Sequence, residues 1–497
     1  MALASNQATS RPATSRWLAL IVLCAGMLMI ILDTTIVNVA LPSIQRDLGF
    51  SQSTLAWVVN AYLIAFGGVL LLAGRFGDLL GQTRVFLAGL VLFTVSSLLC
   101  GLSWSQEVLI AARFVQGVGG AMTSAVVLGM IVTMFPEPGD RARAISVYSF
   151  VASAGASIGL LAGGVLAQAL SWHWIFFVNL PIGIVTFVAA LRYLQRDRGI
   201  GLAEGADAPG AALITAALML GVYTIIRTSD LGWTSPQTLG LAVASIVALM
   251  AFILRESRTP RPLLPLAVFR SRNLSGANIA MVALAAAMFG MFFLTSLYLQ
   301  RVLGMDSFGV GLAFLPVSLS IGALSLGLAA PLIVRFGART VLLPALDLFA
   351  IGMGLLVRVP TEGSYLRDVL PSMVLFGTGA GLAFPSLVTL AMSDATGRDS
   401  GLASGLVNTT RQVGGAIGLA ALAAVSTSRT QDALLAGTPQ LAALVDGFHL
   451  AFLGAAGLLV ATIVAVALMV RPQSESARPD EQESSRRTSG APQSEPA

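Results

Sequence analysis

The sequence predicts an all-α integral membrane protein that crosses the bilayer fourteen times and has both termini in the cytoplasm. Three observations support this prediction. Hydrophobic residues make up 56% of the 497-residue chain and charged residues only 11%, and the mean hydropathy of +0.84 exceeds that of soluble domains. Apolar runs of membrane-spanning length recur between short polar connections. The arginines are concentrated in alternate connections, which predicts the orientation.

Each apolar run is long enough to cross a hydrocarbon core of about 30 Å. The predicted spans are residues 17–41, 55–74, 85–104, 108–134, 144–169, 175–194, 209–227, 237–254, 274–300, 308–330, 338–358, 368–391, 402–424 and 447–470. Their spacing predicts an N-terminal six-helix bundle at 17–198 and a C-terminal six-helix bundle at 272–470. An inserted two-helix hairpin with flanking loops occupies 199–271.

The two ends of the chain are predicted to be tails. Residues 1–16 are rich in Ala, Ser and Thr, and we expect a cytoplasmic N-terminal tail. The apolar run that follows is too long for the core of a signal peptide, so the first span should be retained. Residues 471–497 are rich in Ser, Pro, Glu and Arg, which predicts a disordered cytoplasmic tail.

All 29 basic side chains are arginine. If the N-terminus is cytoplasmic, twenty-one of them fall in cytoplasmic connections and six in opposite ones, while Arg113 and Arg411 fall within spans. The positive-inside rule therefore places both termini in the cytoplasm, which requires an even number of spans. The pI near 9.7 is explained by this topology, and the scattered arginines do not indicate binding to nucleic acid.

The absence of lysine excludes two kinds of chemistry. A Walker A loop needs a lysine for the nucleotide phosphates, and a Schiff base needs a lysine amine. If the protein does work, the energy must therefore come from an ion gradient or from a partner chain. Cys24 and Cys100 lie in separate apolar runs without CxxC or metal-ligand spacing. We expect no catalytic residue, no cofactor and no metal.

An aspartate, Asp33, interrupts the first apolar run. Placing a charged carboxylate at membrane depth costs roughly 2.5–3.5 kcal/mol, so such a residue is a functional candidate by default. Asp33 lies about 24 Å along the outward-running first span at 1.5 Å per residue. Arg113 lies a few residues in from the outer end of span four, so the two side chains can pair. A purely structural salt bridge is the alternative.

The segments 74–81 and 330–337 look like related loops at the cytoplasmic end of the two bundles, which suggests parallel repeats. The first copy resembles the signature loop of the major facilitator superfamily, Gly-x-x-x-Asp-basic-x-Gly-basic-basic. The matching residues are Gly74, Asp78, Gly81 and Arg84.

This loop departs from the family pattern at several positions. Leu79 and Gln82 replace expected basic residues, and Val334 replaces the aspartate in the second copy. The resemblance implies a major facilitator fold and a gating loop in which Asp78 accepts hydrogen bonds at a helix end or pairs with an arginine. That contact would latch one conformation. A simple polar turn between helices is the alternative.

Two further segments resemble antiporter motifs of the same superfamily. The stretch from Arg113 to Ala121 resembles the proton-antiporter motif of span four. In span five, glycines recur every four residues and resemble the motif found in exporters, although Leu160 replaces the usual proline. Helix packing alone also explains such a face. The glycines are Gly155, Gly159 and Gly163, with Gly164 adjacent.

The first-span sequence around Asp33, the stretch 172–183 and the stretch 404–415 resemble the fourteen-helix drug/proton antiporter subfamily of the EmrB/QacA type. Together with the 6+2+6 layout, the resemblance covers nearly all of residues 17–470. It implies a proton-coupled exporter of amphiphilic, often cationic drugs or toxic small molecules that works by alternating access in the bacterial inner membrane. Asp33 and Arg113 would couple proton movement to export.

The implied partners are a small-molecule substrate, protons and the lipid bilayer; a periplasmic adaptor is neither indicated nor excluded. Three alternatives remain open: an exporter dedicated to one metabolite or antibiotic, a lipid transporter, and an uncoupled scaffold or sensor. Arg411 could face the substrate cavity or pair with Asp347. The expected cavity residues are Thr34, Asn38, Tyr62, Gln116, Phe292, Asn408 and Arg411.

Overall fold

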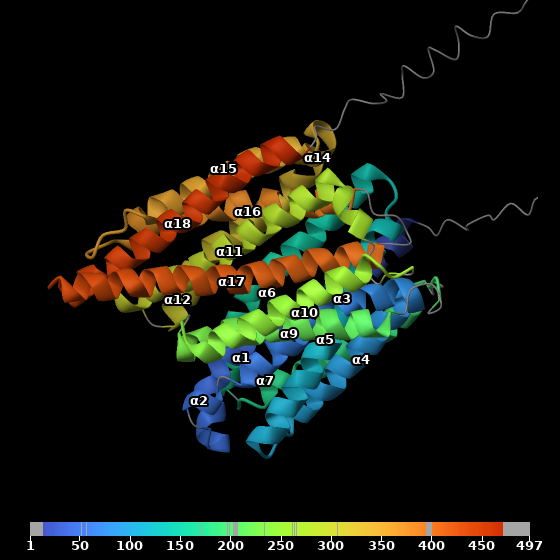
Figure 1. Cartoon of the computed structure of the whole chain (residues 1–497), viewed down its shortest axis with the longest axis horizontal. Helices are drawn as coiled ribbons and strands as arrows, with labels where there is room; N and C mark the ends of the chain where they lie inside the picture. Colours follow the sequence, from blue (N-terminus) through green and yellow to red (C-terminus); the bar gives the residue numbers. More distant parts are fainter. Residues whose placement is uncertain are drawn as a thin grey trace, which may run out of the picture.

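The computed structural model describes residues 13–470 apart from 51, 56, 170, 196, 198, 202–206, 233, 261, 263, 265, 306 and 394–399. Every regular element in this part of the chain is a helix (Figure 1). Among the described residues, eleven helices are long and apolar enough to cross a membrane. The predicted tail 471–497 lies outside the described residues, and the tail 1–16 is described only from Ala13, where the first helix begins.

The N-terminal half is held together by packing between its long helices. Helix α5 contacts α3 and α4, and α6 packs along α1. Small residues make these contacts close, since glycines of α5 lie against α3 and α4. The elements are α1 (Ala13–Leu48), α2 (Gln52–Leu55), α3 (Trp57–Leu80), α4 (Gln82–Gly101), α5 (Gln106–Met134), α6 (Pro138–Ala169), α7 (Trp174–Phe177) and α8 (Asn179–Tyr193).

The C-terminal half is built from helices that pack in a similar way, with α17 against α11 and α15 against α16 and α18. Its first elements are η2 (Leu266–Arg270), α11 (Arg272–Arg301), α12 (Ser307–Ala313), α13 (Leu315–Ala323), the π-helical η3 (Leu324–Ala329) and α14 (Ala330–Phe336). The remaining elements are α15 (Ala338–Leu356), the π-helical η4 (Tyr365–Val369), α16 (Leu370–Ala391), α17 (Ser400–Leu435) and α18 (Gln440–Met469).

Two helical segments differ from the predicted spans. The predicted span 308–330 is divided into α12, α13 and η3, and α14 continues it to Phe336, beyond the predicted end. Pro316 is the second residue of α13 and Pro331 the second residue of α14, and a proline cannot donate the backbone hydrogen bond that a continuous helix needs at that point. Helix α17 continues to Leu435, beyond the predicted end at residue 424.

The inserted hairpin consists of α9 (Ala208–Leu231) and α10 (Pro236–Glu256). Helix α9 packs against α10, α3 and α17, so the hairpin covers a contact between the two halves (Figure 1). Arg255 forms a salt bridge with Asp207 and holds the paired ends of the two helices together, with N···O distances from 2.7 to 3.0 Å.

The two halves meet along two lines, which we name the first and second seams. In the first seam, α3, α4 and α5 face α17; in the second, α6 faces α13, η3 and α14. The two related loops lie at equivalent places in these seams. Gly81 and Gly337 follow α3 and α14 directly, and both have positive φ, 105° and 82°. Glycine adopts this conformation without the Cβ clash that other residues incur.

Candidate functional site

The carboxylate of Asp33 lies inside the N-terminal half, where its side chain has no solvent exposure. Arg113 Nη1 donates to Asp33 Oδ2 at 2.6 Å, and this contact is also an ion pair. Gln116 Nε2 donates to Oδ1 at 2.8 Å, and Asn179 Nδ2 donates to the same oxygen at 3.0 Å. Both carboxylate oxygens are therefore satisfied, as the burial of a charged group requires.

The guanidinium of Arg113 has partners besides the carboxylate. Its Nε donates to the Val58 carbonyl oxygen at 3.0 Å, and Nη1 donates to Gln116 Oε1 at 2.7 Å. The rings of Tyr62 and Phe176 lie 4.4 and 5.7 Å from its central carbon, within the range of cation–π attraction. Arg113 therefore has neutral partners in addition to the carboxylate.

Two polar residues of this site were not predicted from sequence. Ser97 on α4 accepts hydrogen bonds from Gln116 at 3.2 Å and Asn179 at 3.0 Å, and its hydroxyl donates to the Phe176 carbonyl oxygen. Both Ser97 and Asn179 are completely buried within apolar segments. That position is the signal that sequence reasoning could have used. We call Asp33, Arg113, Gln116, Asn179 and Ser97 the Asp33 network.

A second carboxylate, Asp78, lies in the first seam at the predicted cytoplasmic end. Its Oδ1 accepts a hydrogen bond from the Gly401 backbone N–H, and Oδ2 accepts one from Leu402, both at 2.8 Å. Gln82 Nε2 donates to Ser400 Oγ at 2.8 Å. The carboxylate thus occupies the N-terminal end of α17, where unpaired N–H groups and the helix dipole favour negative charge. These bonds join the two halves.

The glycines of the gating loop permit this contact. A Cβ atom at Gly74 would lie 2.6 Å from the Gly401 carbonyl oxygen, closer than real Cβ atoms approach. A Cβ atom at Gly81 would lie 2.9 Å from the Asp197 carbonyl oxygen. The fourth predicted loop residue, Arg84, is exposed, and its guanidinium lies 3.4 Å from the Leu80 carbonyl oxygen. The structure therefore places Arg84 outside the contact with α17.

Asp197, which was not predicted, supports the same loop. Its Oδ1 accepts a hydrogen bond from the Thr83 backbone N–H at 3.0 Å, and Oδ2 accepts one from the Gln82 backbone N–H at 2.5 Å. These are the first residues of α4, so Asp197 caps this helix from a distant part of the chain. Sequence spacing offered no signal for this contact, because 115 residues separate Asp197 from Gln82.

The glycine face of α6 packs against α1 in the same half. A Cβ atom at Gly155 would lie 3.0 Å from the Ile31 side chain, and one at Gly159 would overlap Thr35 Oγ1. The surroundings of Gly163 and Gly164 lie outside the described part of α6. Gly155 and Gly159 therefore allow α6 to pack closely on α1. A role of this glycine face that is specific to export stays a prediction.

The residues predicted to line a substrate cavity lie in several places. Tyr62 and Gln116 are buried in or beside the Asp33 network. The hydroxyl of Thr34 donates to the Ile31 carbonyl oxygen on its own helix at 2.8 Å. Phe292 packs within the C-terminal half, with the Phe314 ring centroid 5.0 Å away. The side chain of Asn38 lies outside the described residues.

The last two predicted cavity residues, Asn408 and Arg411, lie on α17. Asn408 Nδ2 donates to the Ser124 carbonyl oxygen on α5 at 3.3 Å and so adds a fourth hydrogen bond across the first seam. Arg411 Nε is buried and has no hydrogen-bond partner among the described residues. The suggested pairing of Arg411 with Asp347 is wrong for this conformation. Asp347 is exposed on α15, and no ion pair joins the two described side chains.

Comparison with known proteins identifies the family. The profile described as Major Facilitator Superfamily matches residues 23–419. A puromycin resistance protein of Streptomyces alboniger is 38% identical over 95% of both chains. A cephamycin export protein of Amycolatopsis lactamdurans is 37% identical over 92% of this chain and 93% of its own. The crystal structure of a human organic anion transporter shares the fold, with 16% identity, a TM-score of 0.66, and coverage of 92% of this chain and 100% of its own.

The chain therefore belongs to the major facilitator superfamily. It is a multi-pass protein of the bacterial inner membrane and a transporter rather than an enzyme.

Proposed function

We propose that this member of the major facilitator superfamily exports a toxic small molecule in exchange for protons, with Asp33 as the proton-carrying group. The observation that carries the proposal is a fully buried carboxylate held by one arginine and two amide donors at membrane depth. Such a group is costly to keep charged, and it needs a functional reason.

We also propose fourteen membrane-spanning helices, cytoplasmic termini and membership of the drug/proton antiporter subfamily. Helices α6, α9 and α17 run beside the eleven apolar spans, which supports the number fourteen.

Protonation of Asp33 changes the charge balance inside the N-terminal half. The neutral carboxyl no longer compensates Arg113, and a buried ion pair that loses one partner is destabilised by about 3–5 kcal/mol. Arg113 keeps its bonds to Val58 and Gln116, so the strain falls on the contact between α1, which carries Asp33, and α5. A proton can therefore bias the conformation without dismantling the site.

Helix α5 links this site to the first seam. Gln116 binds Asp33, and eight residues further along the same helix the Ser124 carbonyl oxygen accepts the hydrogen bond from Asn408. That separation is about 12 Å along a helix. A shift of α5 on protonation would act on α17 directly. Alternating access then follows from opening and closing the contact between Asp78 and the N-terminal end of α17.

The substrate class is proposed from the relatives. Two proteins that match nearly the whole chain are named for puromycin resistance and for cephamycin export. These names favour an exporter of antibiotic-like, amphiphilic molecules as the first candidate. Because each name gives a single antibiotic, an exporter dedicated to one compound is the second candidate. A broad pump for cationic drugs stays within the same mechanism and differs only in the range of molecules accepted.

The deciding experiment measures uptake into inverted membrane vesicles with an imposed pH gradient. The probes are a fluorescent lipophilic cation, puromycin and a cephamycin. We expect uptake of at least one probe, collapse on addition of a protonophore, and loss in the Asp33→Asn variant. Asp347→Asn is the matched control, because it also removes a carboxylate from a membrane-spanning helix but leaves the Asp33 network intact.

A double variant separates coupling from a structural salt bridge. Asp33→Asn with Arg113→Gln removes both charges, so it avoids the uncompensated guanidinium that the single variant leaves buried. We expect the double variant to fold and to exchange substrate downhill, but not to concentrate it with a pH gradient. Uphill uptake by a well-folded double variant would show that the proton is carried elsewhere.

A further inference from the structure

One arginine inside the predicted membrane region has no charged partner among the described residues. Sequence reasoning placed two arginines within spans, Arg113 and Arg411. The first is fully paired, since Asp33, Gln116 and Val58 all accept hydrogen bonds from it. The Nε of Arg411 is buried without a hydrogen-bond partner, and no described carboxylate acts on its charge. A buried guanidinium of this kind needs a partner that the described protein does not supply.

Arg411 lies between the two halves and near the middle of the membrane. The Tyr148 side chain on α6 is completely buried and interacts with both Arg411 and Asn408 of α17. Asn408 in turn donates to the Ser124 carbonyl oxygen on α5. Helix α17 begins at Ser400, at the predicted cytoplasmic end, and Arg411 is about 16 Å further along it, roughly half of a hydrocarbon core of about 30 Å. Transporters built from repeats bind their substrates near this depth.

The Arg411 side chain is accessible at this depth. One turn before it, Asn408 is held by α5. One turn after it, Gly415 packs on α11 so closely that a Cβ atom would lie 2.9 Å from the Phe289 ring. Between these two contacts, Arg411 keeps part of its surface exposed although it lies deep within the protein. A small molecule that enters between the halves can therefore reach the guanidinium.

Two other arginines with a buried, unpartnered Nε have compensation elsewhere. Arg339 Nη2 donates to the Ala467 carbonyl oxygen at 2.7 Å. Arg75 lies close enough to Asp78 for the two charges to attract each other. In the part of the chain that the structure describes, Arg411 has neither an acid nor a carbonyl acceptor. An ionisable residue at membrane depth is a functional candidate by default, and this one lacks a structural reason for its charge.

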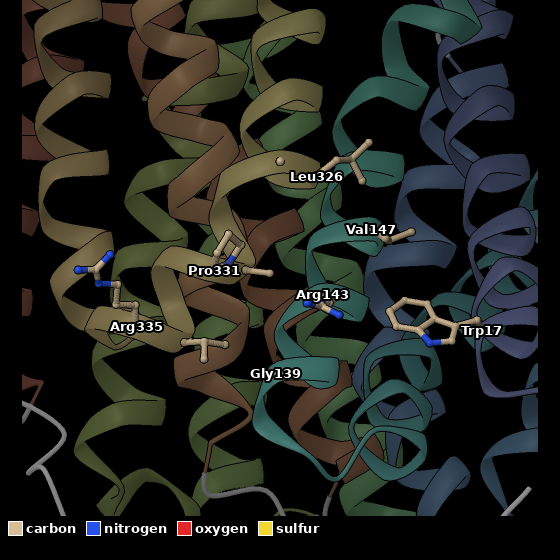
Figure 2. A pocket seen from close by; sticks show the side chains of 10 residues that line it. Trp17, Gly139, Arg143, Val147, Leu326, Pro331 and Arg335 are labelled. Atoms are coloured by element: carbon tan, nitrogen blue, oxygen red, sulfur yellow. The ribbon is translucent and has the colours of Figure 1, made fainter. Parts of the chain in front are cut away.

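Arginines at the surface need no such partner. Arg143 and Arg335 line a groove at the predicted cytoplasmic end of the second seam, and both side chains are exposed (Figure 2). Water solvates an exposed guanidinium, so an unpaired charge there costs little. The interior position of Arg411 is what makes its missing partner informative.

We propose that Arg411 binds an anionic group of the exported molecule, a carboxylate or another organic oxyanion. The proposal rests on the export function proposed above and names its substrate class, an amphiphilic organic anion. A planar guanidinium presents parallel N–H donors that match the two oxygens of a carboxylate. The same charge repels a cation. Asp33 is left to carry the proton, because both its oxygens are already held within the Asp33 network.

Equilibrium binding to the purified full-length protein tests the proposal without transport. The probes are a radiolabelled cephamycin, which carries a carboxylate, and its methyl ester, which lacks that charge. We expect the wild type to bind the acid about 10- to 100-fold more tightly than the ester, as a hydrogen bond to a charged group predicts. Arg411→Gln should lose this preference, and Arg411→Lys should keep part of it. Arg192→Gln, exposed at the end of α8, is the matched control and should bind as wild type.

Thermal unfolding gives an arm that needs no ligand. Arg411→Met should raise the unfolding temperature by about 1–4 °C, because it removes a buried charge that has no partner. Arg113→Met should lower the temperature, because it leaves Asp33 buried without its arginine. The acid should raise the unfolding temperature of the wild type but not of Arg411→Met. A lower unfolding temperature in ligand-free Arg411→Met would show that the guanidinium already has a stabilising partner and would overturn the proposal.

Three binding results would also overturn it. They are equal or tighter binding of the ester or of a lipophilic cation by the wild type, an unchanged preference in Arg411→Gln, and no saturable binding of the acid. None of these readouts depends on a proton gradient. If the acid binds through Arg411 but the wild type shows no uptake driven by pH, the export function fails while the anion site stands.

Discussion

The two seams between the halves share a backbone plan but differ in what joins them. In the first, the Asp78 carboxylate accepts two backbone hydrogen bonds from α17, and the α9–α10 hairpin packs over the contact. In the second, Val334 stands at the equivalent place and lines a groove together with Arg143 and Arg335. Gly81 and Gly337 keep the same positive φ in both. A repeat can therefore keep its turn while its chemistry diverges.

The first seam requires glycine at its closest backbone contact, and the second seam does not. Glycines Gly74 and Gly401 bring the two backbones together so closely that neither tolerates a Cβ atom. The residue equivalent to Gly74 in the second copy is Ala330, which already carries a Cβ atom and borders the groove. The backbones of the first seam lie in close contact, whereas the second seam contains a groove.

The largest expected effect comes from adding bulk to the first seam. Gly74→Val should reduce export to background and destabilise the closed conformation by about 1–3 kcal/mol, because the new side chain overlaps the Gly401 carbonyl oxygen. Ala330→Val is the matched change in the second seam and should retain most activity. Vesicle uptake and thermal unfolding measure both effects. Equal losses in the two variants would contradict the difference between the seams.

Loss of the carboxylate should open the first seam more often. Asp78→Asn removes the charge and one of two acceptors at the end of α17, which costs about 1–2 kcal/mol. The labelling rate of a cysteine introduced at the buried Ser404 should rise roughly 5- to 30-fold with a membrane-impermeant thiol reagent applied from the cytoplasmic side. The native cysteines, Cys24 and Cys100, are buried and give the background. Val334→Ala, as the control, should leave the rate unchanged.

The two turns should respond alike, since their backbone is the shared part of the repeat. Gly81→Ala and Gly337→Ala each force a Cβ atom into a left-handed conformation, at a cost of about 1–2 kcal/mol. The loss at Gly81 should be the larger, because its Cβ atom also meets the Asp197 carbonyl oxygen. Thermal unfolding of the purified variants measures both losses. An unchanged unfolding temperature for Gly337→Ala would show that the turns are not equivalent.

The smallest effect is expected at the hairpin that covers the first seam. The Arg255 guanidinium holds the pKa of Asp207 below its usual range. A carboxyl with a lowered folded pKa stabilises the fold above its unfolded pKa, near 4, and that stabilisation is lost as pH falls through the folded value. Arg255 is 40% exposed, so the gain is at most about 1 kcal/mol.

Hydrogen exchange in α9 and α10 measures this effect. Wild-type protection in the hairpin should fall when the pH drops below about 4, whereas Asp207→Asn should show the reduced protection already at pH 7. Arg255→Gln should behave like Asp207→Asn, because either change removes the ion pair. Protection of the second seam should not change in these variants, since the hairpin packs on α3 and α17.

Sequence reasoning was most successful for contacts that depend on position along a helix. The positions of Asp33 and Arg113 along their spans allowed the two side chains to pair, and the structure brings them within 2.6 Å. Asp78 was expected to meet a helix end or an arginine, and it meets the end of α17. Arg84 belongs to the motif by sequence but makes no contact with α17 among the described residues.

The sequence by itself determined the membrane-spanning class, the superfamily, the repeated turns and the loss of the aspartate at Val334. These features depend on hydropathy, local spacing and backbone conformation, which neighbouring residues specify. The tertiary structure alone decided that Ser97 and Asn179 complete the Asp33 network, that Asp197 caps α4, and that the second seam leaves a basic groove. Each of these requires residues far apart in the chain to meet, and the depth and direction of those meetings depend on how whole helices pack.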